Sequence, residues 1–289
     1  MMPLEIELVT TEKCNLSCAY CYMNNNSRAF NLETFKQFRK SLTKILDIYN
    51  TYEYNFSFFG GEPLLNWDFI KQSLPLIRSD KRCKEILMPT NGLLLNQERY
   101  EFLKSFNVKI SISFDGLFQH YNRQDVAGND TFHLYIDKLV FFKEIVDQFK
   151  TMIHPENVRD PKGLLNNYKF FIENGFNNAD FTIVRDDIWD KDAINNFDEA
   201  LGLLSDYVAE NWYKHKNIPA PFALMFLQMS DYYMFGKRDF ACFAGNSGIG
   251  VFANGKVYPC ARFGSNMQDF WIYDYITNQL NAEVFNYIK

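Results

Sequence analysis

The sequence has no run of about 18 apolar residues, the length that a membrane-spanning helix needs. Its N-terminal residues, 1–7, lack the basic start and the apolar stretch of a secretory signal peptide. Lys and Arg are scattered and the formal net charge is -5, which argues against nonspecific nucleic-acid binding but not against a small or peptide substrate. No segment is polar enough to indicate disorder. These absences predict a cytoplasmic globular protein without a membrane partner.

The sequence has only 6 cysteines, and three of them lie close together. Cys14, Cys18 and Cys21 are separated by three and two residues and follow an apolar run over residues 4–9. Three thiolates cannot pair off as disulfides, and in a reducing cytosol thiols bind metal instead. They can hold one face of a [4Fe–4S] cluster, and since no fourth cysteine lies nearby, one iron would stay open to another ligand. The alternatives are a structural zinc knuckle or chance clustering.

Strand-like and amphipathic helical stretches alternate over the first two-thirds of the chain. The strands are expected at residues 4–10, 54–59, 84–88, 108–114, 149–154 and 181–185. The helices are expected from about residue 31, and at 66–78, 97–105, 131–147 and 163–174. Such alternation implies parallel strands with right-handed crossovers. The fold class predicted is therefore α/β, an open, partial (β/α)6 barrel of the TIM type.

Unusual loops follow the first four predicted strands. The cysteines follow the first strand, and the next three strands end in Gly60-Gly61-Glu62-Pro63, Thr90-Asn91-Gly92 and Ser113-Phe114-Asp115-Gly116. In barrels of this type the chemistry lies in loops at the C-terminal ends of the strands. All four loops are therefore expected on one rim, although the last two could each be a plain β-to-α turn.

The glycine pair at residues 60 and 61 is suited to close backbone approach. Paired glycines tolerate positive φ and let backbone polar groups approach a ligand, while Pro63 fixes the exit from the strand. Glu62 is expected to order the loop rather than to titrate, and an ordinary turn is the alternative. Ser111 and Ser113 alternate with apolar neighbours, so both should face the barrel interior.

The ends of the fifth and sixth strands also carry polar residues. Strand six ends in Arg185-Asp186-Asp187, and His154 and Asn157 follow strand five. These side chains either line a substrate pocket or are structural or solvated. None of the 4 histidines has a metal-ligand partner at helical or loop spacing. No catalytic residue is assigned on this basis.

The pattern Cys-x3-Cys-x-aromatic-Cys after a first strand, with Tyr20 as the aromatic, resembles the radical S-adenosylmethionine (SAM) enzymes. In that family three cysteines hold a [4Fe–4S] cluster whose free iron chelates the amino and carboxylate groups of SAM. One electron then cleaves SAM to a 5′-deoxyadenosyl radical, which abstracts a substrate hydrogen. The resemblance implies the same two cofactors here, and an electron donor such as flavodoxin or ferredoxin.

The resemblance also implies a set of SAM contacts. Residues 60–63 resemble the segment that binds the amino group of SAM. The loops at residues 90–92 and 113–116 resemble those near the ribose and the methionine carboxylate. Arg123 matches a position where a guanidinium meets that carboxylate, a solvated Arg being the alternative. The expected SAM-binding residues are Tyr20, Gly60, Gly61, Glu62, Pro63, Thr90, Asn91, Ser111, Ser113, Asp115 and Arg123.

A second cysteine signal lies near the C-terminal end. Residues 249–252 and 256–258 predict a hairpin around Asn254-Gly255, with Cys242 and Cys260 at its two ends. This pattern resembles the opening half of the SPASM extension of peptide-modifying radical SAM enzymes, where it supplies two ligands to an auxiliary [4Fe–4S] cluster. No cysteine follows Cys260. Either the extension is a shortened, twitch-like form that still holds a cluster, or only the hairpin remains.

The expected organisation is a radical SAM barrel at 1–190, a helical connector at 191–237 and a SPASM- or twitch-like extension at 238–289. Cys83 is expected to be a buried thiol. The function predicted is an oxidoreductase-like radical SAM enzyme that modifies a residue in a peptide or protein, although no separate domain for binding a peptide leader is visible. A small-molecule or nucleoside substrate is the alternative. A non-catalytic iron–sulfur electron carrier or sensor is the competing class.

Overall fold

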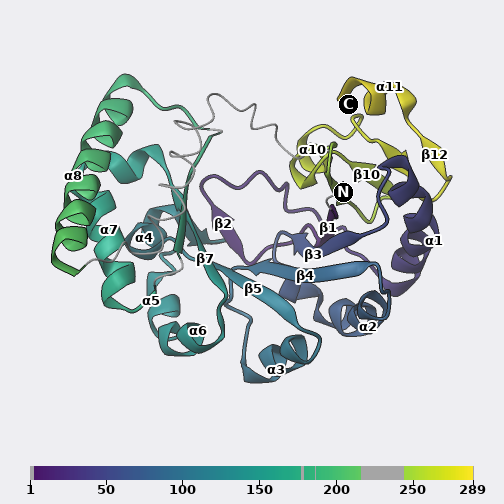
Figure 1. Ribbon diagram of the computed structural model, residues 1–289, viewed down its shortest axis with the longest axis horizontal. Helices are drawn as coiled ribbons and strands as arrows, with labels where there is room; N and C mark the ends of the chain where they lie inside the picture. The colour runs from purple at the N-terminus through teal and green to yellow at the C-terminus, as the bar shows by residue number, and fades with distance from the viewer. Residues whose placement is uncertain (1–2, 177–178, 186, 216–243, 289) are drawn as a thin grey trace. The chain divides into compact units, whose positions relative to one another are not determined.

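The structure is a computed structural model that describes residues 3–176, 179–185, 187–215 and 244–288 (Figure 1). These residues form two compact units. The first holds residues 3–15, 22–111 and 244–288. The second holds residues 16–21 and the described residues from 112 to 215. The chain therefore enters the second unit twice, once within the cysteine loop and once within a strand.

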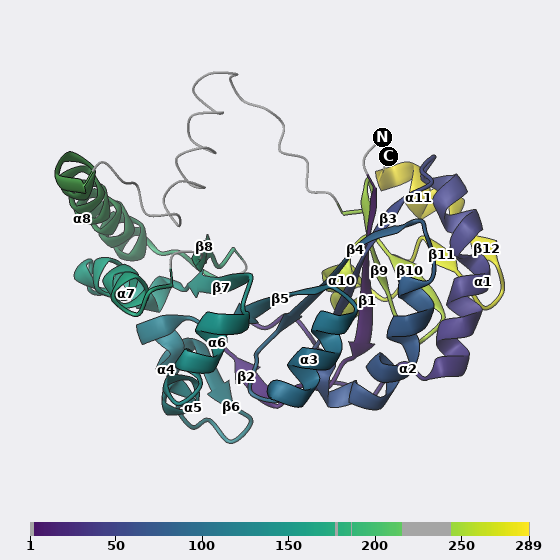
Figure 2. The ribbon, with the colours of Figure 1, turned by 60° about the horizontal axis from the view of Figure 1, so that its bottom comes forward.

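Parallel strands form the centre of the first unit. They are β1 (Leu4–Thr11), β3 (Tyr54–Gly60), β4 (Cys83–Thr90) and the first residues of β5 (Val108–Ser113). The order is β1-β3-β4-β5, with β1 and β4 parallel to β3 on either side. The helices α1 (Leu32–Ile48), α2 (Trp67–Arg78) and α3 (Gln97–Ser105) lie on one side of these strands (Figure 2). This is the alternating arrangement that the sequence predicts.

The position of α1 follows from its cap and its apolar face. The Asn31 side chain accepts a hydrogen bond from the Thr34 N–H, which fixes the first turn. Phe35 and Phe38 are buried on the inner face of the helix, and the Phe35 ring makes an edge contact with Phe56 of β3. Burying one such side chain contributes about 1.5–3 kcal/mol, so this face holds the helix on the sheet.

The C-terminal residues of the first unit extend its sheet. The hairpin of β9 (Gly248–Val251) and β10 (Lys256–Tyr258) is confirmed, with Gly255 at φ 90° in its turn. The hairpin is part of the main sheet, because β9 pairs in parallel with the edge of β1 that does not face β3. The remaining elements are α10 (Ala261–Asn266), β11 (Tyr273–Asp274), β12 (Gln279–Leu280) and α11 (Ala282–Ile288).

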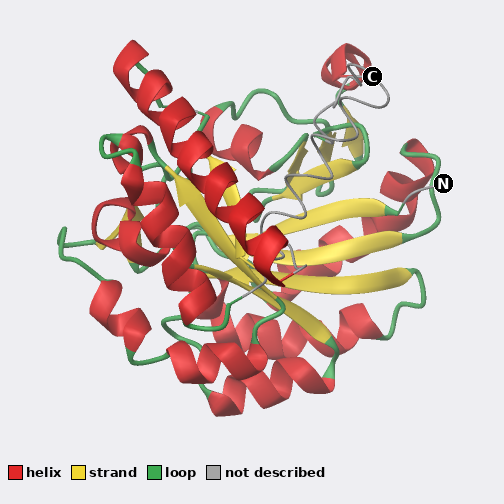
Figure 3. Ribbon diagram, turned by 60° about the vertical axis from the view of Figure 1, so that its left-hand side comes forward, coloured by secondary structure: helices red, strands yellow, loops and turns green. Residues whose placement is uncertain are grey.

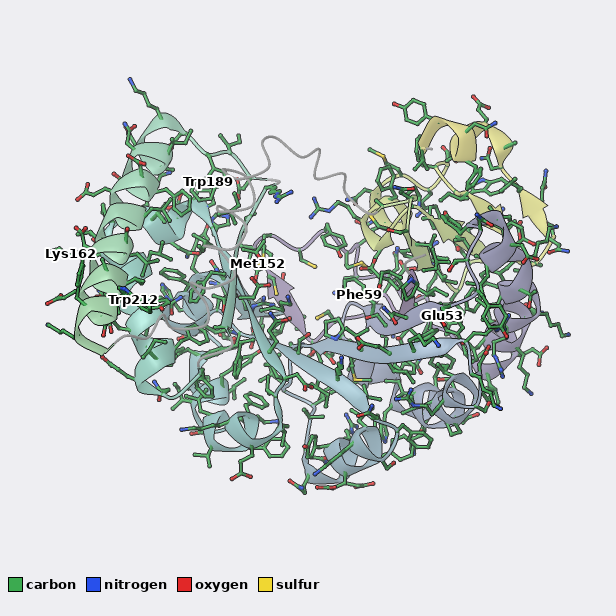
Figure 4. All side chains as sticks on the ribbon, viewed as in Figure 1. Glu53, Phe59, Met152, Lys162, Trp189 and Trp212 are labelled. Carbon is green, nitrogen blue, oxygen red and sulfur yellow. The ribbon has the colours of Figure 1, made fainter. Side chains whose placement is uncertain are left out.

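The second unit contains the end of β5, β7 (Gln148–Ile153) and β8 (Ala179–Ile183), with β7 parallel to β8. Helices α7 (Lys162–Glu173) and α8 (Lys191–His215) pack through Tyr168, Leu204 and their neighbours. The long helix in Figure 3 is α8. Trp189, labelled in Figure 4, packs against the same cluster. Helix α8 lies in the first part of the predicted connector. Two three-residue strands, β2 (Leu16–Cys18) and β6 (Arg123–Asp125), pair antiparallel.

One predicted element is wrong. The helix expected at 131–147 is two short helices, α5 (Phe132–Ile136) and α6 (Leu139–Ile145). The Lys138 N–H donates to the Tyr135 carbonyl, three residues earlier in the chain. This is the tighter 3₁₀ pattern, and it ends the α-helical hydrogen bonding of α5. The Tyr135 ring, at the end of α5, stacks on the Phe114 ring with 4.9 Å between the centroids. The helix thus ends where this ring packs into the core.

Short elements connect these strands to the helices. They are η1 (Pro63–Asn66), η2 (Gly116–Phe118), α4 (Gln119–Asn122) and η3 (Pro155–Val158). Among the helices described here, none is both long and apolar enough to cross a membrane.

Candidate active site

The loop after β3 is held directly against the backbone that leads into the cysteines. Gly60 has φ 138°, and a Cβ there would lie 2.2 Å from the Thr11 carbonyl oxygen. A Cβ at Gly61 would lie 2.3 Å from the Lys13 carbonyl oxygen. The Gly61 and Glu62 N–H groups donate to these two carbonyls at 2.9 and 2.8 Å. Only glycine permits this approach, so the glycine pair fixes the path of the chain just before Cys14.

Glu62 is the centre of the polar network in the first unit. Its side chain is completely buried and accepts hydrogen bonds from Leu64 N, from Thr90 Oγ1 at 2.6 Å and from Asn91 N at 2.7 Å. Burial raises the pKa of this carboxyl above its ordinary value, although the three hydrogen bonds oppose the shift. Glu62 thus joins the loop after β3 to the loop after β4. Pro63 begins η1 and is also buried.

Asn91 carries this network to the first cysteine. Its Nδ2 donates to Asn15 Oδ1 at 2.8 Å and lies 3.9 Å from Cys14 Sγ. From the other direction, Asn25 Oδ1 accepts a hydrogen bond from the Cys14 N–H at 3.0 Å. Asn15 and Asn25 were not among the predicted site residues. The sequence signal for Asn25 is its place in the asparagine run at residues 24–26.

Asp115 has the corresponding place in the second unit. Its completely buried carboxylate accepts hydrogen bonds from Tyr20 OH at 2.6 Å and from the Met152 N–H at 2.8 Å; Met152, on β7, is labelled in Figure 4. Asn122 Nδ2 donates to the same carboxylate at 3.1 Å. Asp115 therefore ties the aromatic residue of the cysteine loop to the end of β5 and to the neighbouring strand.

Arg123 forms a buried ion pair with Asp115. Its Nε lies 3.0 Å from one carboxylate oxygen and its Nη2 lies 3.3 Å from the other, and the side chain is 8% exposed. The third nitrogen, Nη1, lies 3.9 Å from Cys18 Sγ. The guanidinium also sits over the Tyr20 ring, 5.3 Å from its centroid. Arg123 is thus not a solvated surface residue, and two of its nitrogens are engaged by Asp115.

Backbone pairing holds the second cysteine beside this arginine. Cys18 in β2 is opposite Arg123 in β6, and the Cys21 N–H donates to the Cys18 carbonyl at 3.0 Å. Burial raises the pKa of the Cys18 thiol to about 11, with Arg123 acting in the opposite direction. Cys21 is exposed.

The remaining predicted site residues lie as follows. Ser111 and Ser113 are half-buried on β5 and belong to different units. Cys260 is the N-cap residue of α10, whereas Cys242 and Asp186 lie outside the described residues. Arg185 is exposed. Cys83 is a buried thiol at the start of β4.

His154 caps the short helix η3 at the end of β7. Its Nδ1 accepts the Glu156 N–H at 3.2 Å, so Nε2 carries the proton and donates to Asp187 Oδ2 at 2.5 Å. The Asn157 side chain accepts the His154 N–H at 2.7 Å and completes the cap of η3. His154 and Asn157 thus form the cap of η3, and the contact of His154 with Asp187 joins the loop after β7 to the loop after β8.

The donors in the cysteine loop fit an iron–sulfur cluster. Cys14, Cys18 and Cys21 are thiols, and soft thiolates are the ligands that such clusters take. Two of the three sulfurs have an N–H donor at 3.9 Å, the type of contact that tunes clusters. Within the described ranges, no three His, Cys, Asp or Glu side chains gather around one point as they would for a single metal ion. A cluster differs because each thiolate binds a different iron.

The sequence profile of the radical SAM superfamily matches residues 8–167, more than half of the chain. The chain belongs to the radical SAM superfamily. This membership implies SAM and a [4Fe–4S] cluster as cofactors, and the matching relatives with assigned activities are enzymes. The matched residues include all four rim loops predicted from the sequence, the cysteine loop among them.

Among curated proteins, the chain is 31% identical over 155 residues to the radical SAM cyclopropyl synthase TigE of Paramaledivibacter caminithermalis, covering 48% of this chain and 32% of TigE. It is 25% identical over 197 residues to the cysteine-type anaerobic sulfatase-maturating enzyme of Clostridium perfringens, covering 64% of this chain and 52% of that enzyme. It is 30% identical over 123 residues to the GTP 3′,8-cyclase of Clostridium acetobutylicum, covering 39% of this chain and 35% of that enzyme. The chain thus spans about a third to a half of these relatives.

Solved structures show the same fold. Native anSMEcpe with bound AdoMet and Cp18Cys peptide matches with a TM-score of 0.74 at 22% identity, over 98% of this chain and 80% of that one. Streptococcus suis SuiB bound to precursor peptide SuiA matches with a TM-score of 0.61 at 17% identity, over 98% and 64%. The predicted fold class, an α/β fold with the parallel strands of a partial TIM-type barrel, is confirmed.

Proposed function

We propose that this protein binds SAM at a [4Fe–4S] cluster held by Cys14, Cys18 and Cys21, cleaves it reductively, and abstracts hydrogen from a residue in a peptide or protein. The observation that carries the proposal is the pair of buried networks that end at the cysteines. One runs from Glu62 through Asn91 to Cys14, and the other runs from Asp115 through Arg123 to Cys18. When bound, the cluster would supply the electron that converts SAM to a 5′-deoxyadenosyl radical.

The chain's own residues orient the ligands of this site. Asn91 and Arg123 direct N–H groups at two cysteine sulfurs, where such donors stabilise the thiolate form and affect the reduction potential of a cluster. The glycine pair brings the loop after β3 directly against the Thr11 and Lys13 backbone. Residues 60–63 are proposed to bind the amino group of SAM, as the corresponding segment does in the family. Ser113, Thr90 and the remaining predicted contacts complete the proposed SAM site.

A peptide or protein substrate is supported by the relatives. The sulfatase-maturating enzyme and the subtilosin biosynthesis protein AlbA of Bacillus subtilis are among the matches, and three matching structures hold a peptide. The GTP 3′,8-cyclase matches support a second candidate, a nucleoside-type substrate. Incubating the reduced enzyme with SAM and either GTP or a precursor peptide separates the two, because only the true substrate should increase 5′-deoxyadenosine formation and acquire a changed mass.

The central test is anaerobic reconstitution with iron and sulfide, followed by reduction with dithionite or a flavodoxin- or ferredoxin-type donor. The parent protein should form 5′-deoxyadenosine from SAM, and the triple variant Cys14→Ala/Cys18→Ala/Cys21→Ala should not. Cys83→Ala is the matched control, since Cys83 is a buried thiol outside the loop. Unchanged product in the triple variant would refute the proposal. A cluster that forms but does not bind SAM would favour the electron carrier or sensor.

The C-terminal cysteines are proposed to hold an auxiliary iron–sulfur cluster, as a shortened SPASM- or twitch-like extension. In that case reconstitution should load more iron than the roughly four atoms of one [4Fe–4S] cluster. The double variant Cys242→Ala/Cys260→Ala should lose the excess but still cleave SAM. Parent-like iron content in that variant would show that no auxiliary cluster forms.

A further inference from the structure

The helix α10, which follows Cys260, packs against the segment that follows Cys21. Tyr22 and Met23 belong to the same apolar cluster as Phe252 and Tyr258 of the hairpin and Ala261 of α10. The cluster also includes Val9 at the end of β1. Residues at the two ends of the chain thus share one small core, and the exit from the cysteine loop is part of it.

Polar contacts fix the register of this packing. The Ser265 side chain is buried, and its hydroxyl lies 3.1 Å from the Met23 sulfur. The Ser265 carbonyl accepts a hydrogen bond from Asn24 Nδ2. The Arg262 guanidinium lies over the Tyr22 ring, 4.7 Å from its centroid. Three successive residues, 22, 23 and 24, are therefore each held by α10.

The next residue, Asn25, contacts the first cysteine of the loop, Cys14. Asn25 has φ 46°, and its Oδ1 accepts the Cys14 N–H at 3.0 Å. Asn is one of the few side chains that tolerate this left-handed conformation. The residues that α10 holds therefore lie between Cys21, which directly precedes them, and the side chain that orients Cys14.

We propose that α10 is a positioning element for the SAM-binding cluster, with Arg262, Ser265 and Asn24 as its contact residues and Asn25 as the link to Cys14. The proposal rests on the cluster assigned to Cys14, Cys18 and Cys21 under the proposed function. It gives the C-terminal extension a role at the radical centre that does not require an auxiliary cluster. Partners of this kind, one step outside the ligands, typically change metal affinity by about 10–100-fold.

The first test removes the contacts to α10. In the double variant Asn24→Ala/Arg262→Ala, the SAM-dependent change in the cluster's electron paramagnetic resonance spectrum should weaken. Iron should be lost to a chelator about tenfold faster than from the parent. Lys104→Ala is the matched control, because Lys104 also lies over an aromatic ring, that of Tyr100, and neither residue belongs to this cluster. Arg262→Lys should keep iron retention and the spectral change closer to those of the parent, since lysine keeps a cation over the Tyr22 ring.

A second pair of variants guards against general misfolding. Asn25→Gly keeps the left-handed backbone but removes the acceptor for the Cys14 N–H, whereas Asn25→Asp keeps an oxygen there. Only the glycine variant should lose iron faster. Equal iron retention and unchanged spectra in the Asn24/Arg262 double variant and in Asn25→Gly would overturn the positioning role. Failure of the parent protein to cleave SAM would instead overturn the proposed function.

Discussion

Each compact unit holds a residue near a cysteine sulfur through a buried carboxylate, but the charge of the held residue differs between the two units. In the first unit a buried carboxylate, Glu62, holds a neutral amide, Asn91, whose Nδ2 lies 3.9 Å from a cysteine sulfur. In the second unit a buried carboxylate, Asp115, holds a cation, Arg123, whose Nη1 lies 3.9 Å from another. Glu62 receives neutral donors and has a raised pKa, while Asp115 is neutralised by an ion pair. Glu62 therefore accepts mainly from backbone N–H groups, whereas Asp115 accepts mainly from side chains.

This difference predicts unequal costs when each carboxylate is removed. Replacing Glu62 affects hydrogen bonds to two loops, because its partners are two N–H groups and a hydroxyl. Replacing Asp115 leaves a buried guanidinium without its counter-charge. The second loss is the more expensive, since an uncompensated charge in a low-dielectric interior costs more than an unsatisfied amide.

The largest effect is expected from Asp115→Asn. It should lower the free energy of unfolding of the cluster-free protein by about 3–5 kcal/mol, because Arg123 stays buried without its partner. Anaerobic urea denaturation measures this value. Asp68→Asn is the control: the Asp68 side chain is 83% exposed, and its substitution should change stability by less than about 0.5 kcal/mol. Similar values for the two variants would contradict the role given to Asp115.

Glu62→Gln should cost less, about 1–3 kcal/mol. Whichever way the amide is turned, its NH2 faces either the Leu64 or the Asn91 N–H, so one backbone donor loses its acceptor. The cost should also depend on pH. Because burial raises the folded-state pKa of Glu62, its contribution is full below the ordinary carboxyl pKa of about 4.3 and is lost as pH rises through the folded value. Parent and variant should therefore differ more at acid pH, and a gap that widens with rising pH would argue against this assignment.

Arg123→Lys tests the cationic half without removing the charge. Lysine is a point donor and cannot bond both Asp115 oxygens while directing a third N–H at Cys18. The dissociation constant for SAM should rise by roughly tenfold, which is about 1.4 kcal/mol, the size of one charge-assisted hydrogen bond. Calorimetric titration of the reconstituted protein measures it, with Arg185→Lys, at an exposed position, as the control. An unchanged constant would confine Arg123 to a structural role.

The smallest effect is expected from Tyr20→Phe. The phenylalanine ring can keep the contact with the Arg123 guanidinium but loses the hydroxyl that donates to Asp115. A loss of about 1 kcal/mol in stability is expected. Urea denaturation of Tyr20→Phe beside Tyr20→Leu separates the two contributions, since leucine removes both. If the phenylalanine variant were as unstable as the leucine variant, the hydroxyl would outweigh the ring.

The sequence predicted what depends on local pattern. The helix at residues 97–105 and the strand at 256–258 have the bounds expected, and Asn31 caps α1, because periodicity and capping are local signals. The rim loops were identified because each follows a strand. The pairing of β2 with β6 was not predicted, since three-residue strands have no readable periodicity. The ion pair of Asp115 and Arg123 and the packing of α10 on residues 22–24 depend on the folded loops, which no spacing rule specifies.

The parallel pairing of β9 with β1 also has a consequence for how the chain folds. Leu8 of β1 is opposite Val251, so the edge of β1 that pairs with β9 stays open until residues 248–251 have been synthesised. Contacts between residues so far apart in sequence form late, because the connecting loop must be closed first. An open strand edge is also a template for pairing with other chains. Folding from the ribosome should therefore leave this edge of β1 exposed until β9 arrives. Pulse-labelled hydrogen exchange would detect this as late protection of the Glu7 and Val251 amides, which face the β1–β9 pairing.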